Sequence, residues 1–265
     1  MPGLIYLVGE MKGYKVSAAL TVKGLGLTIG GAKILSDISL EVAKNETLGI
    51  IGPNGAGKTS FFNLLSGVRE PTSGEIWLEE RNITNLTSDK RAKLGIARTF
   101  QTSSVFVNLS ALENVRIAAQ IANGHSMNLI RNAYAYKSVV DRAQQCLEQV
   151  GLGAYSMHLA GSLSHGDKRR LEIAIVLAQS GEIVLLDEPM AGMSVENVPE
   201  LVEIIRTLSK VHGKTVLIVE HHMDVILNLA DRIAVLNYGE LLMLDTPAEV
   251  MRNPVVLSAY IGEAL

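Results

Sequence analysis

A glycine-rich stretch near residue 55 has the composition and spacing of a phosphate-binding loop. It fits the pattern G-x-x-x-x-G-K-[ST] and comprises Gly52, Pro53, Asn54, Gly55, Ala56, Gly57, Lys58 and Thr59. Glycines let the backbone turn tightly enough for successive N–H groups to converge on phosphate oxygens. Lys58 can reach the β- and γ-phosphates of a nucleotide, and the Thr59 hydroxyl can bind Mg²⁺.

The surroundings of this stretch distinguish it from an ordinary glycine-rich turn. An apolar run at residues 48–51 precedes it, and a helix-like run at residues 60–68 follows it. The N-terminus of such a helix carries partial positive charge and would face the same anion. Ser60 therefore joins the loop as a candidate nucleotide-binding residue.

Two acidic residues end a second apolar segment. Residues 182–187 read as a strand buried on both faces, as in a parallel sheet, and this strand ends at Asp187. Ligands gather at the carboxyl edge of such sheets. Asp187 could hold Mg²⁺ through water, and Glu188 could orient or deprotonate an attacking water. A simple strand end before Pro189 is the alternative, and the phosphate-binding stretch upstream favours the functional interpretation.

A third polar element precedes a helix-like run. Residues 163–167 read Leu-Ser-His-Gly-Asp, and Ser164 can cap the helix that follows. The N-terminus of this helix is also suited to an anion. Taken alone, the pentapeptide is explained equally well by capping.

The elements between these motifs predict an α/β fold with a mainly parallel sheet. Strand and helix patterns alternate from residue 46 onward, which favours this class. Strand-like residues 20–27 and 37–42 flank a Gly30-Gly31 pair, which predicts an antiparallel hairpin. The helical block between Gln101 and residue 182 is too long for a simple crossover, so we expect it to form a lobe of its own.

Composition excludes several classes of protein. The 265 residues are 48% hydrophobic with a net charge of −3, so the chain is not a disordered polymer and has no basic footprint for nucleic acid. Cys146 is the only cysteine, so no intrachain disulfide can form, and its apolar neighbours predict a core thiol. No secretory signal and no run long enough to span a bilayer is found. Any role at a membrane would therefore require a partner.

Together these motifs resemble the ATP-binding-cassette (ABC) ATPases. The phosphate loop, Gln101, residues 163–167, Asp187-Glu188 and His221 occur in that family's order. The resemblance implies a P-loop, RecA-like α/β core with an antiparallel β subdomain, and ATP and Mg²⁺ as ligands. It implies a nucleotide-binding domain at residues 18–265, a helical subdomain at about 102–178 and an N-terminal extension at 1–17.

The resemblance also implies roles for individual residues. Gln101 would link the Mg²⁺ and the attacking water to a membrane partner, and His221 would contact the γ-phosphate. Ser164 and Gly166 would bind the γ-phosphate of ATP held by a second ATPase subunit, either a copy of this chain or a paralogue. The active unit would then be a head-to-tail pair.

Finer features are similar to branched-chain amino acid importers. They are Arg98-Thr99-Phe100-Gln101, residues 188–193, residues 220–223 and the ending at residues 259–263. This implies integral membrane permease subunits, an extracytoplasmic solute-binding protein acting through them, and a peripheral location at the cytoplasmic face of the inner membrane. Relatives that move urea, short amides or other small polar solutes look much alike, so the solute stays open.

Two other functions are weighed against the importer. An ATPase for lipid or lipopolysaccharide export also occurs as a separate subunit, but residues 98–100 favour the importer branch. An ATP-gated switch acting on nucleic acid or ribosomes usually has two cassettes or a long coiled coil. This chain has one cassette, no heptad run and an acidic balance.

Several positions depart from the family pattern. His165 and Asp167 replace the usual residues of Leu-Ser-Gly-Gly-Gln, and we expect nearby cations at residues 168–170 to offset Asp167. Ser194 stands where many members have Asp, and Ile29 stands where an aromatic usually stacks on adenine. Of the neighbouring histidines, we expect His221 rather than His222 to face the phosphate.

Overall fold

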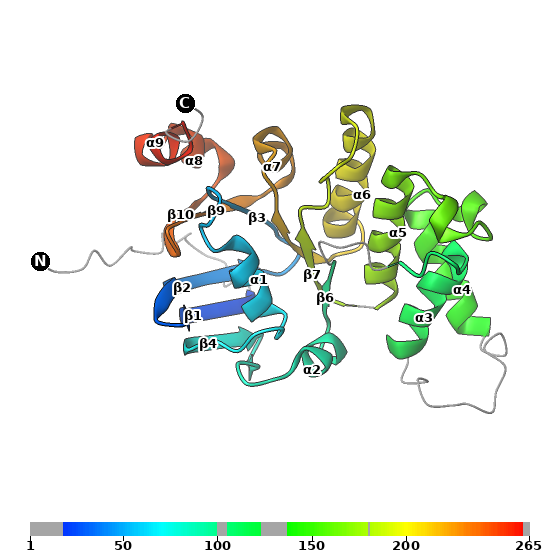
Figure 1. Cartoon of the computed structure of the whole chain (residues 1–265), viewed down its shortest axis with the longest axis horizontal. Coiled ribbons are helices and arrows are strands. Elements are labelled where there is room, and N and C mark those ends of the chain that lie inside the picture. The colour runs from blue at the N-terminus through cyan, green and yellow to red at the C-terminus, as the bar shows by residue number, and fades with distance from the viewer. Residues whose placement is uncertain (1–17, 100–104, 123–136, 180, 262–265) are drawn as a thin grey trace, which may run out of the picture.

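The computed structural model describes residues 18–99, 105–122, 137–179 and 181–261. Its centre is a six-stranded sheet in the order β10-β9-β3-β8-β7-β6 (Figure 1). The five strands from β9 to β6 are parallel, and β10 pairs antiparallel with β9. The bounds are β3 (Thr47–Ile51), β6 (Ile96–Arg98), β7 (Ile183–Asp187), β8 (Thr215–Val219), β9 (Arg232–Asn237) and β10 (Glu240–Asp245). Every residue of β3, β7 and β8 is buried, which confirms the mainly parallel sheet.

A second, four-stranded sheet is antiparallel, with the order β2-β1-β4-β5. Its strands are β1 (Ala18–Ile29), β2 (Ala32–Ala43), β4 (Ser73–Leu78) and β5 (Arg81–Asn82). Gly30 and Gly31 form the β1–β2 turn, and both have positive φ, of 55° and 85°. Such a two-residue turn requires positive φ at both central positions, which explains the Gly-Gly pair and confirms the predicted hairpin.

Helix α1 (Lys58–Leu65) follows the phosphate loop and is shorter than the sequence predicted. The sequence predicts a helix-like run to residue 68, but α1 ends at Leu65 and Val68 is 55% exposed. The Ser66 hydroxyl bonds to the carbonyl oxygen of Phe62, and Gly67 then adopts a φ of 73°. A left-handed glycine is a common helix terminator, so the turn at Gly67 ends the helix early.

Three further helices pack together at one end of the molecule (Figure 1). They are α3 (Ala111–Ala122), α4 (Lys137–Gln149) and α5 (His165–Ala178). Cys146 is fully buried among them as a free thiol, as predicted, and burial raises the pKa of that thiol. The apolar core of these helices is continuous with the one under the main sheet, where Val184 and Ile218 lie. The subdomain limits at residues 102 and 178 and the extension at 1–17 stay predictions.

The remaining helices flank the sheets. They are α2 (Ser88–Lys93), α6 (Val198–Lys210), α7 (Met223–Leu229), α8 (Pro247–Arg252) and α9 (Pro254–Ile261). Helices α6 and α7 share the first core, whereas α1 packs in a second core between the two sheets. In the part of the chain that the structure describes, no helix combines the length and apolar character needed to cross a bilayer.

Candidate functional site

The phosphate loop joins the end of β3 to the start of α1, and two of its glycines are required by close packing. A Cβ at Gly52 would come within 2.2 Å of the carbonyl oxygen of Leu236, and one at Gly57 within 2.5 Å of Leu35 Cδ2. Gly57 also has a φ of 96° and precedes α1 without a side-chain cap. The first N–H groups of α1 are therefore left for an anion, as a phosphate-binding loop requires.

Lys58 is held inside this loop. Its side chain is buried, and Nζ donates to the carbonyl oxygens of Gly52 at 2.5 Å and Pro53 at 2.9 Å. Thr59 and Ser60 follow in the first turn of α1, both half-buried. The loop thus places one ammonium group and two hydroxyl groups at the N-terminus of a single helix.

The ends of β7 and β8 bring an acid and a histidine into contact. These strands are neighbours, and Glu188 Oε1 lies 2.9 Å from His221 Nε2. Glu188 has a φ of 49°, and its N–H donates to the carbonyl oxygen of Val219. Strand β8 ends at Val219, so His221 and His222 lie in the turn that follows it. Of the two histidines, His221 is the one that contacts Glu188, and which of them faces the phosphate stays a prediction.

Asp187 is buried beside this pair with one oxygen engaged. Oδ2 accepts a hydrogen bond from Arg98 at 2.9 Å, whereas Oδ1 has no partner among the described residues. Burial raises the pKa of Asp187 above its ordinary value, and the Arg98 guanidinium opposes that rise. Burying an oxygen without a hydrogen-bond partner costs free energy unless a ligand or water satisfies it. Oδ1 of Asp187 is therefore the oxygen best suited to bind a ligand.

Glu220 is a further residue of this edge that sequence reasoning assigned no role. It is 2% exposed, and its two oxygens accept the backbone N–H groups of Met190 at 2.8 Å and His221 at 3.2 Å. Burial raises the pKa of its carboxyl group, and these two bonds oppose the rise. The carboxylate therefore ties the segment after Glu188 to the segment that carries His221. The sequence contained a signal for it, because Glu220 directly follows the buried strand β8, just as Glu188 directly follows β7.

The 163–167 segment lies apart from these groups, at the start of α5. Ser164 caps the helix by accepting the N–H of Asp167 at 3.1 Å, and its hydroxyl donates to Asp167 Oδ2 at 2.7 Å. Of the three cations expected to offset Asp167, only Arg170 contacts it, at 2.6 Å. Lys168 and Arg169 instead bond to the carbonyl oxygen of Gly161 and to Glu172. Both side chains thus have other local partners, and the offset of Asp167 by their charges stays a prediction.

The segment after Glu188 packs against the start of α5. A Cβ at Gly192 would lie 3.1 Å from the ring of His165, and one at Gly166 would lie 3.5 Å from Asn197 Nδ2. Ser194 accepts a hydrogen bond from that same amide group at 2.9 Å. His165 is thus accommodated because the residue facing its ring is a glycine.

Ile29, at the end of β1, is 42% exposed. Gln101 lies outside the described residues, which include its neighbours Thr99 and Val105.

Residues 35–191 match the ABC transporter family. The chain belongs to the ABC transporter family. It is 40% identical to the high-affinity branched-chain amino acid transport ATP-binding protein LivG of Salmonella typhimurium, over 92% of this chain and 98% of LivG. It is 33% identical to the lipopolysaccharide export system ATP-binding protein LptB of Escherichia coli, over 93% of this chain and 98% of LptB.

Solved cassettes confirm the fold. The ADP conformation of MJ1267, an ATP-binding cassette of an ABC transporter, superposes with a TM-score of 0.81 at 28% identity, over 92% of this chain and 99% of that one. The dimeric structure of MJ0796, a bacterial ABC transporter cassette, gives 0.73 at 25% identity, over 86% of this chain and 98% of that one. As a member of this family, the chain is an ATPase with a P-loop nucleotide-binding core.

Proposed function

We propose that this chain is the ATP-hydrolysing subunit of an importer for branched-chain amino acids or similar small polar solutes. The observation that carries the ATPase role is the contact of Glu188 with His221, beside the phosphate loop. The identity of 40% to LivG against 33% to LptB favours import over lipopolysaccharide export. Arg98-Thr99-Phe100 before Gln101 favours the same branch.

Each site residue has a place in this proposal. Residues 52–60 bind the phosphates of ATP, with Lys58 on the β- and γ-phosphates. Glu188 accepts the proton of the attacking water, and His221 contacts the γ-phosphate while its ring orients the Glu188 carboxylate. Glu220 keeps these two segments in register through the N–H groups of Met190 and His221.

The residues also fit a magnesium ion. Mg²⁺ in nucleotide sites takes one or two carboxylates, a hydroxyl group, water and the phosphates, so it does not require a cluster of acids. The residues that would hold it are Asp187, through its unpartnered buried oxygen, Thr59 and Gln101. When bound, the ion would neutralise charge that develops on the phosphates.

We further propose that two ATPase subunits pair head to tail. Ser164 and Gly166 then complete the site of the other subunit from the start of α5. The dimeric form of the related cassette MJ0796 supports this pairing. In this arrangement the second subunit is a copy of this chain or a paralogue, and neither contacts nucleic acid.

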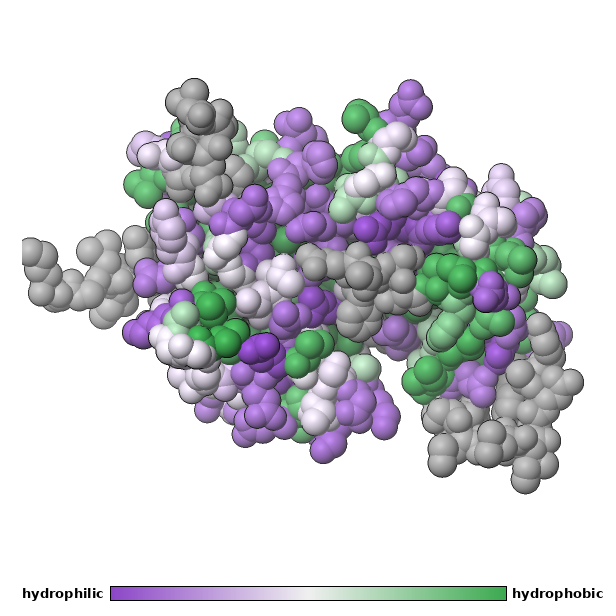
Figure 2. Space-filling model, in the orientation of Figure 1, coloured by the Kyte–Doolittle hydropathy of each residue, from purple (hydrophilic) through white to green (hydrophobic). Residues whose placement is uncertain are grey.

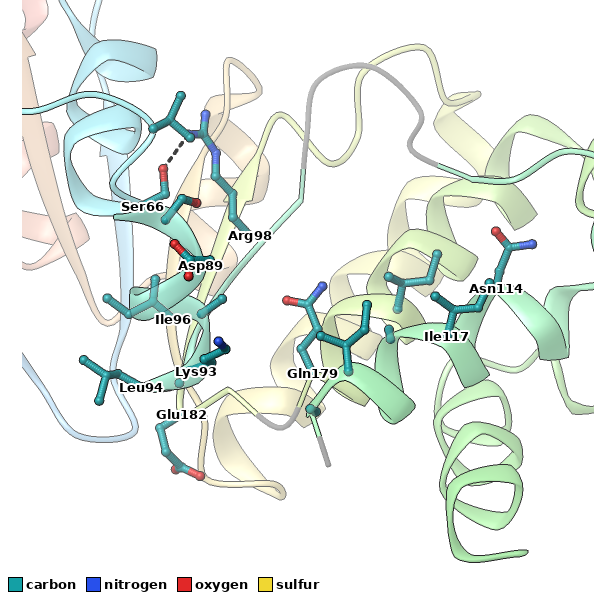
Figure 3. A pocket seen from close by; sticks show the side chains of 18 of the residues that line it. Ser66, Asp89, Lys93, Leu94, Ile96, Arg98, Asn114, Ile117, Gln179 and Glu182 are labelled. Atoms are coloured by element: carbon teal, nitrogen blue, oxygen red, sulfur yellow. Dashed lines mark hydrogen bonds between the residues drawn. The ribbon is translucent and has the colours of Figure 1, made fainter. Parts of the chain in front are cut away.

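A groove between the sheets and the helical lobe suits the permease partner. Its volume is about 700 Å³, with Ile96 and Arg98 on one wall and Ile117 and Gln179 on the other (Figure 3). Phe106, 57% exposed, also lines this groove, and hydrophobic surface extends over the helical lobe (Figure 2). Arg98 and Phe106 flank the segment that contains Gln101. A permease segment seated here would hold the subunit at the cytoplasmic face of the membrane, with a solute-binding protein on the far side.

Uptake measurements test the transport role. The chain is expressed with the permease encoded nearest to its gene, in cells lacking their own branched-chain importers, and uptake of labelled leucine, urea and a short amide is compared. We expect uptake of one small solute that is lost in Glu188→Gln. Permease-independent ATPase activity together with rescue of lipopolysaccharide export would contradict import.

A further inference from the structure

Arg98 lies between the proposed permease groove and the acidic edge, which is the end of β7 and β8 that carries Asp187, Glu188, Glu220 and His221. The proposed mechanism gives Arg98 no task. Its guanidinium donates to Asn63 Oδ1 at 2.7 Å and Ser66 Oγ at 2.9 Å through one nitrogen, and to Asp187 Oδ2 at 2.9 Å through another. The carbon at its centre lies 5.8 Å from the centroid of the Phe62 ring. One side chain from β6 therefore binds α1 and β7 together.

These contacts define which oxygen of Asp187 is available. The Arg98 and Asp187 side chains are 8% and 0% exposed, so water competes little for this pair. Arg98 occupies Oδ2, and the N–H of Asp187 bonds to Thr99 Oγ1 at 3.2 Å, whereas Oδ1 is buried without a partner in the described chain. With one oxygen held, the carboxylate cannot rotate without breaking a charge-assisted bond, which is among the stronger hydrogen bonds in proteins.

The other contacts of Arg98 set the distance between the acid and the phosphate loop. Asn63 and Ser66 lie on or next to α1, the helix that begins at Lys58. A guanidinium presents its donors in a rigid planar fork, so the same group that fixes Asp187 also fixes its position relative to α1. Lysine has a single nitrogen and could not reproduce this geometry.

We propose that Arg98 is a positioning residue for the metal-side carboxylate: it holds Asp187 Oδ2 and so presents Oδ1 to the magnesium ion of bound MgATP. The inference rests on the proposed role of Asp187. Since Arg98 also lines the groove (Figure 3), the carboxylate is held by a side chain that a partner seated there would touch.

The test measures how much Mg²⁺ strengthens ATP binding, with no hydrolysis involved. ATP affinity of the full chain is determined by calorimetry in Mg²⁺ and in EDTA, and the ratio of the two is the magnesium gain. Arg98→Met removes the fork, and Arg98→Lys retains the charge. Arg232→Met is the matched control, because Arg232 pairs with the buried carboxylate of Glu46 at 2.6 Å at the opposite end of β3.

We expect the magnesium gain to fall by about tenfold in Arg98→Met, the size of one charge-assisted hydrogen bond. It should fall less in Arg98→Lys and be unchanged in Arg232→Met, with affinity in EDTA preserved throughout. A normal gain in both Arg98 variants would overturn the proposal, as would an equal fall in Arg232→Met. If Arg98→Met does not fold, the Arg98→Lys comparison decides alone.

Asp187→Asn distinguishes an error in the proposed metal ligand from an error in the role of Arg98. If this variant loses the magnesium gain while the Arg98 variants keep it, Asp187 binds the ion and only the role of Arg98 is wrong. If Asp187→Asn keeps a normal gain, the proposed metal ligand is wrong and the inference about Arg98 falls with it.

Discussion

The side chains of the acidic edge are held by contacts between residues distant in sequence, whereas those at the start of α5 are held mainly by near neighbours. At the acidic edge, residues far apart in sequence contact one another: Arg98 bonds to Asp187, and Glu188 to His221. At the start of α5, Ser164 and Asp167 bond to each other, Lys168 bonds to the nearby Gly161, and Arg170 reaches Glu200 of α6. The first region is assembled by the fold of one chain, whereas the second is a preformed cap on a separate lobe. A site shared between two subunits requires this difference. Each chain would supply its own site with the phosphate loop and the acidic edge, which together form the built half. It would offer the start of α5 to the site of its neighbour.

Lys58→Ala should have the largest effect, because it removes the ammonium group that lies inside the phosphate loop. ATP binding should weaken by about a hundredfold or more, since the ammonium would make more than one charge-assisted hydrogen bond to the phosphates. Nucleotide binding by calorimetry and phosphate release measure this. Lys210→Ala, which removes a surface ion pair with Asp231, is the control. Near-normal turnover in Lys58→Ala would refute the assignment of the loop.

Glu188→Gln should separate binding from chemistry within the same half. The amide keeps the shape and a hydrogen bond but cannot accept a proton, so turnover should fall by about 10²–10⁴-fold with ATP affinity retained. Unhydrolysed ATP should then hold the subunits together, and the protein should sediment as a dimer in ATP and a monomer in ADP. Normal hydrolysis would transfer the base role to another residue, with His221 the first candidate.

Ser164→Ala tests the start of α5, which is proposed to complete the site of the neighbouring subunit. In the Glu188→Gln background it should weaken the ATP-dependent dimer by about 10–100-fold, because a hydrogen bond to a charged phosphate is lost. ATP affinity of the monomer should not change, since Ser164 serves the neighbouring subunit. Ser162→Ala, which removes a local bond to Leu159, is the control. A change in monomer affinity with an unchanged dimer would place Ser164 in its own subunit's site.

Glu220→Gln should give a moderate effect confined to the built half. The amide nitrogen cannot accept a hydrogen bond, so the N–H of either Met190 or His221 loses its acceptor. We expect turnover to fall by about tenfold, the cost of one buried unsatisfied group, with ATP affinity retained. Glu182→Gln, at an exposed ion pair with Lys214, is the control. Equal losses of binding and turnover would indicate a general loss of structure instead.

Ile29→Tyr should have the smallest effect, and it tests how the built half holds the base of ATP. Stacking of a base on an aromatic ring is worth about 1–3 kcal/mol, and isoleucine recovers part of it by packing, so ATP should bind up to about tenfold tighter. Discrimination among purine nucleotides should also increase. Val211→Tyr, another exposed aliphatic position, controls for added surface area. Unchanged nucleotide affinity would show that the base stacks elsewhere, with Tyr6 and Tyr14 as candidates outside the described residues.

Features that depend on neighbours along the chain were predictable from the sequence. The phosphate loop, the Gly30-Gly31 turn and the Ser164 cap are each set by bonds within a few residues, so residue type and spacing suffice. The buried strand ending at Asp187 was predictable for a similar reason, because an unbroken apolar run is typical of a strand covered on both faces. Even local reasoning failed where a single turn ended α1 at Gly67.

Features that depend on strand order were decided only by the tertiary structure. Arg98 and Asp187 are 89 residues apart, and they meet because β6 pairs with β7. Met190 and Glu220 meet because β7 lies beside β8, and that same pairing brings His221 into contact with Glu188. Spacing along the chain carries no information on which strands become neighbours, since that choice is made by burying apolar faces of the whole sheet. The sequence alone therefore determined which chemical groups this protein has, and the fold determined which of them touch.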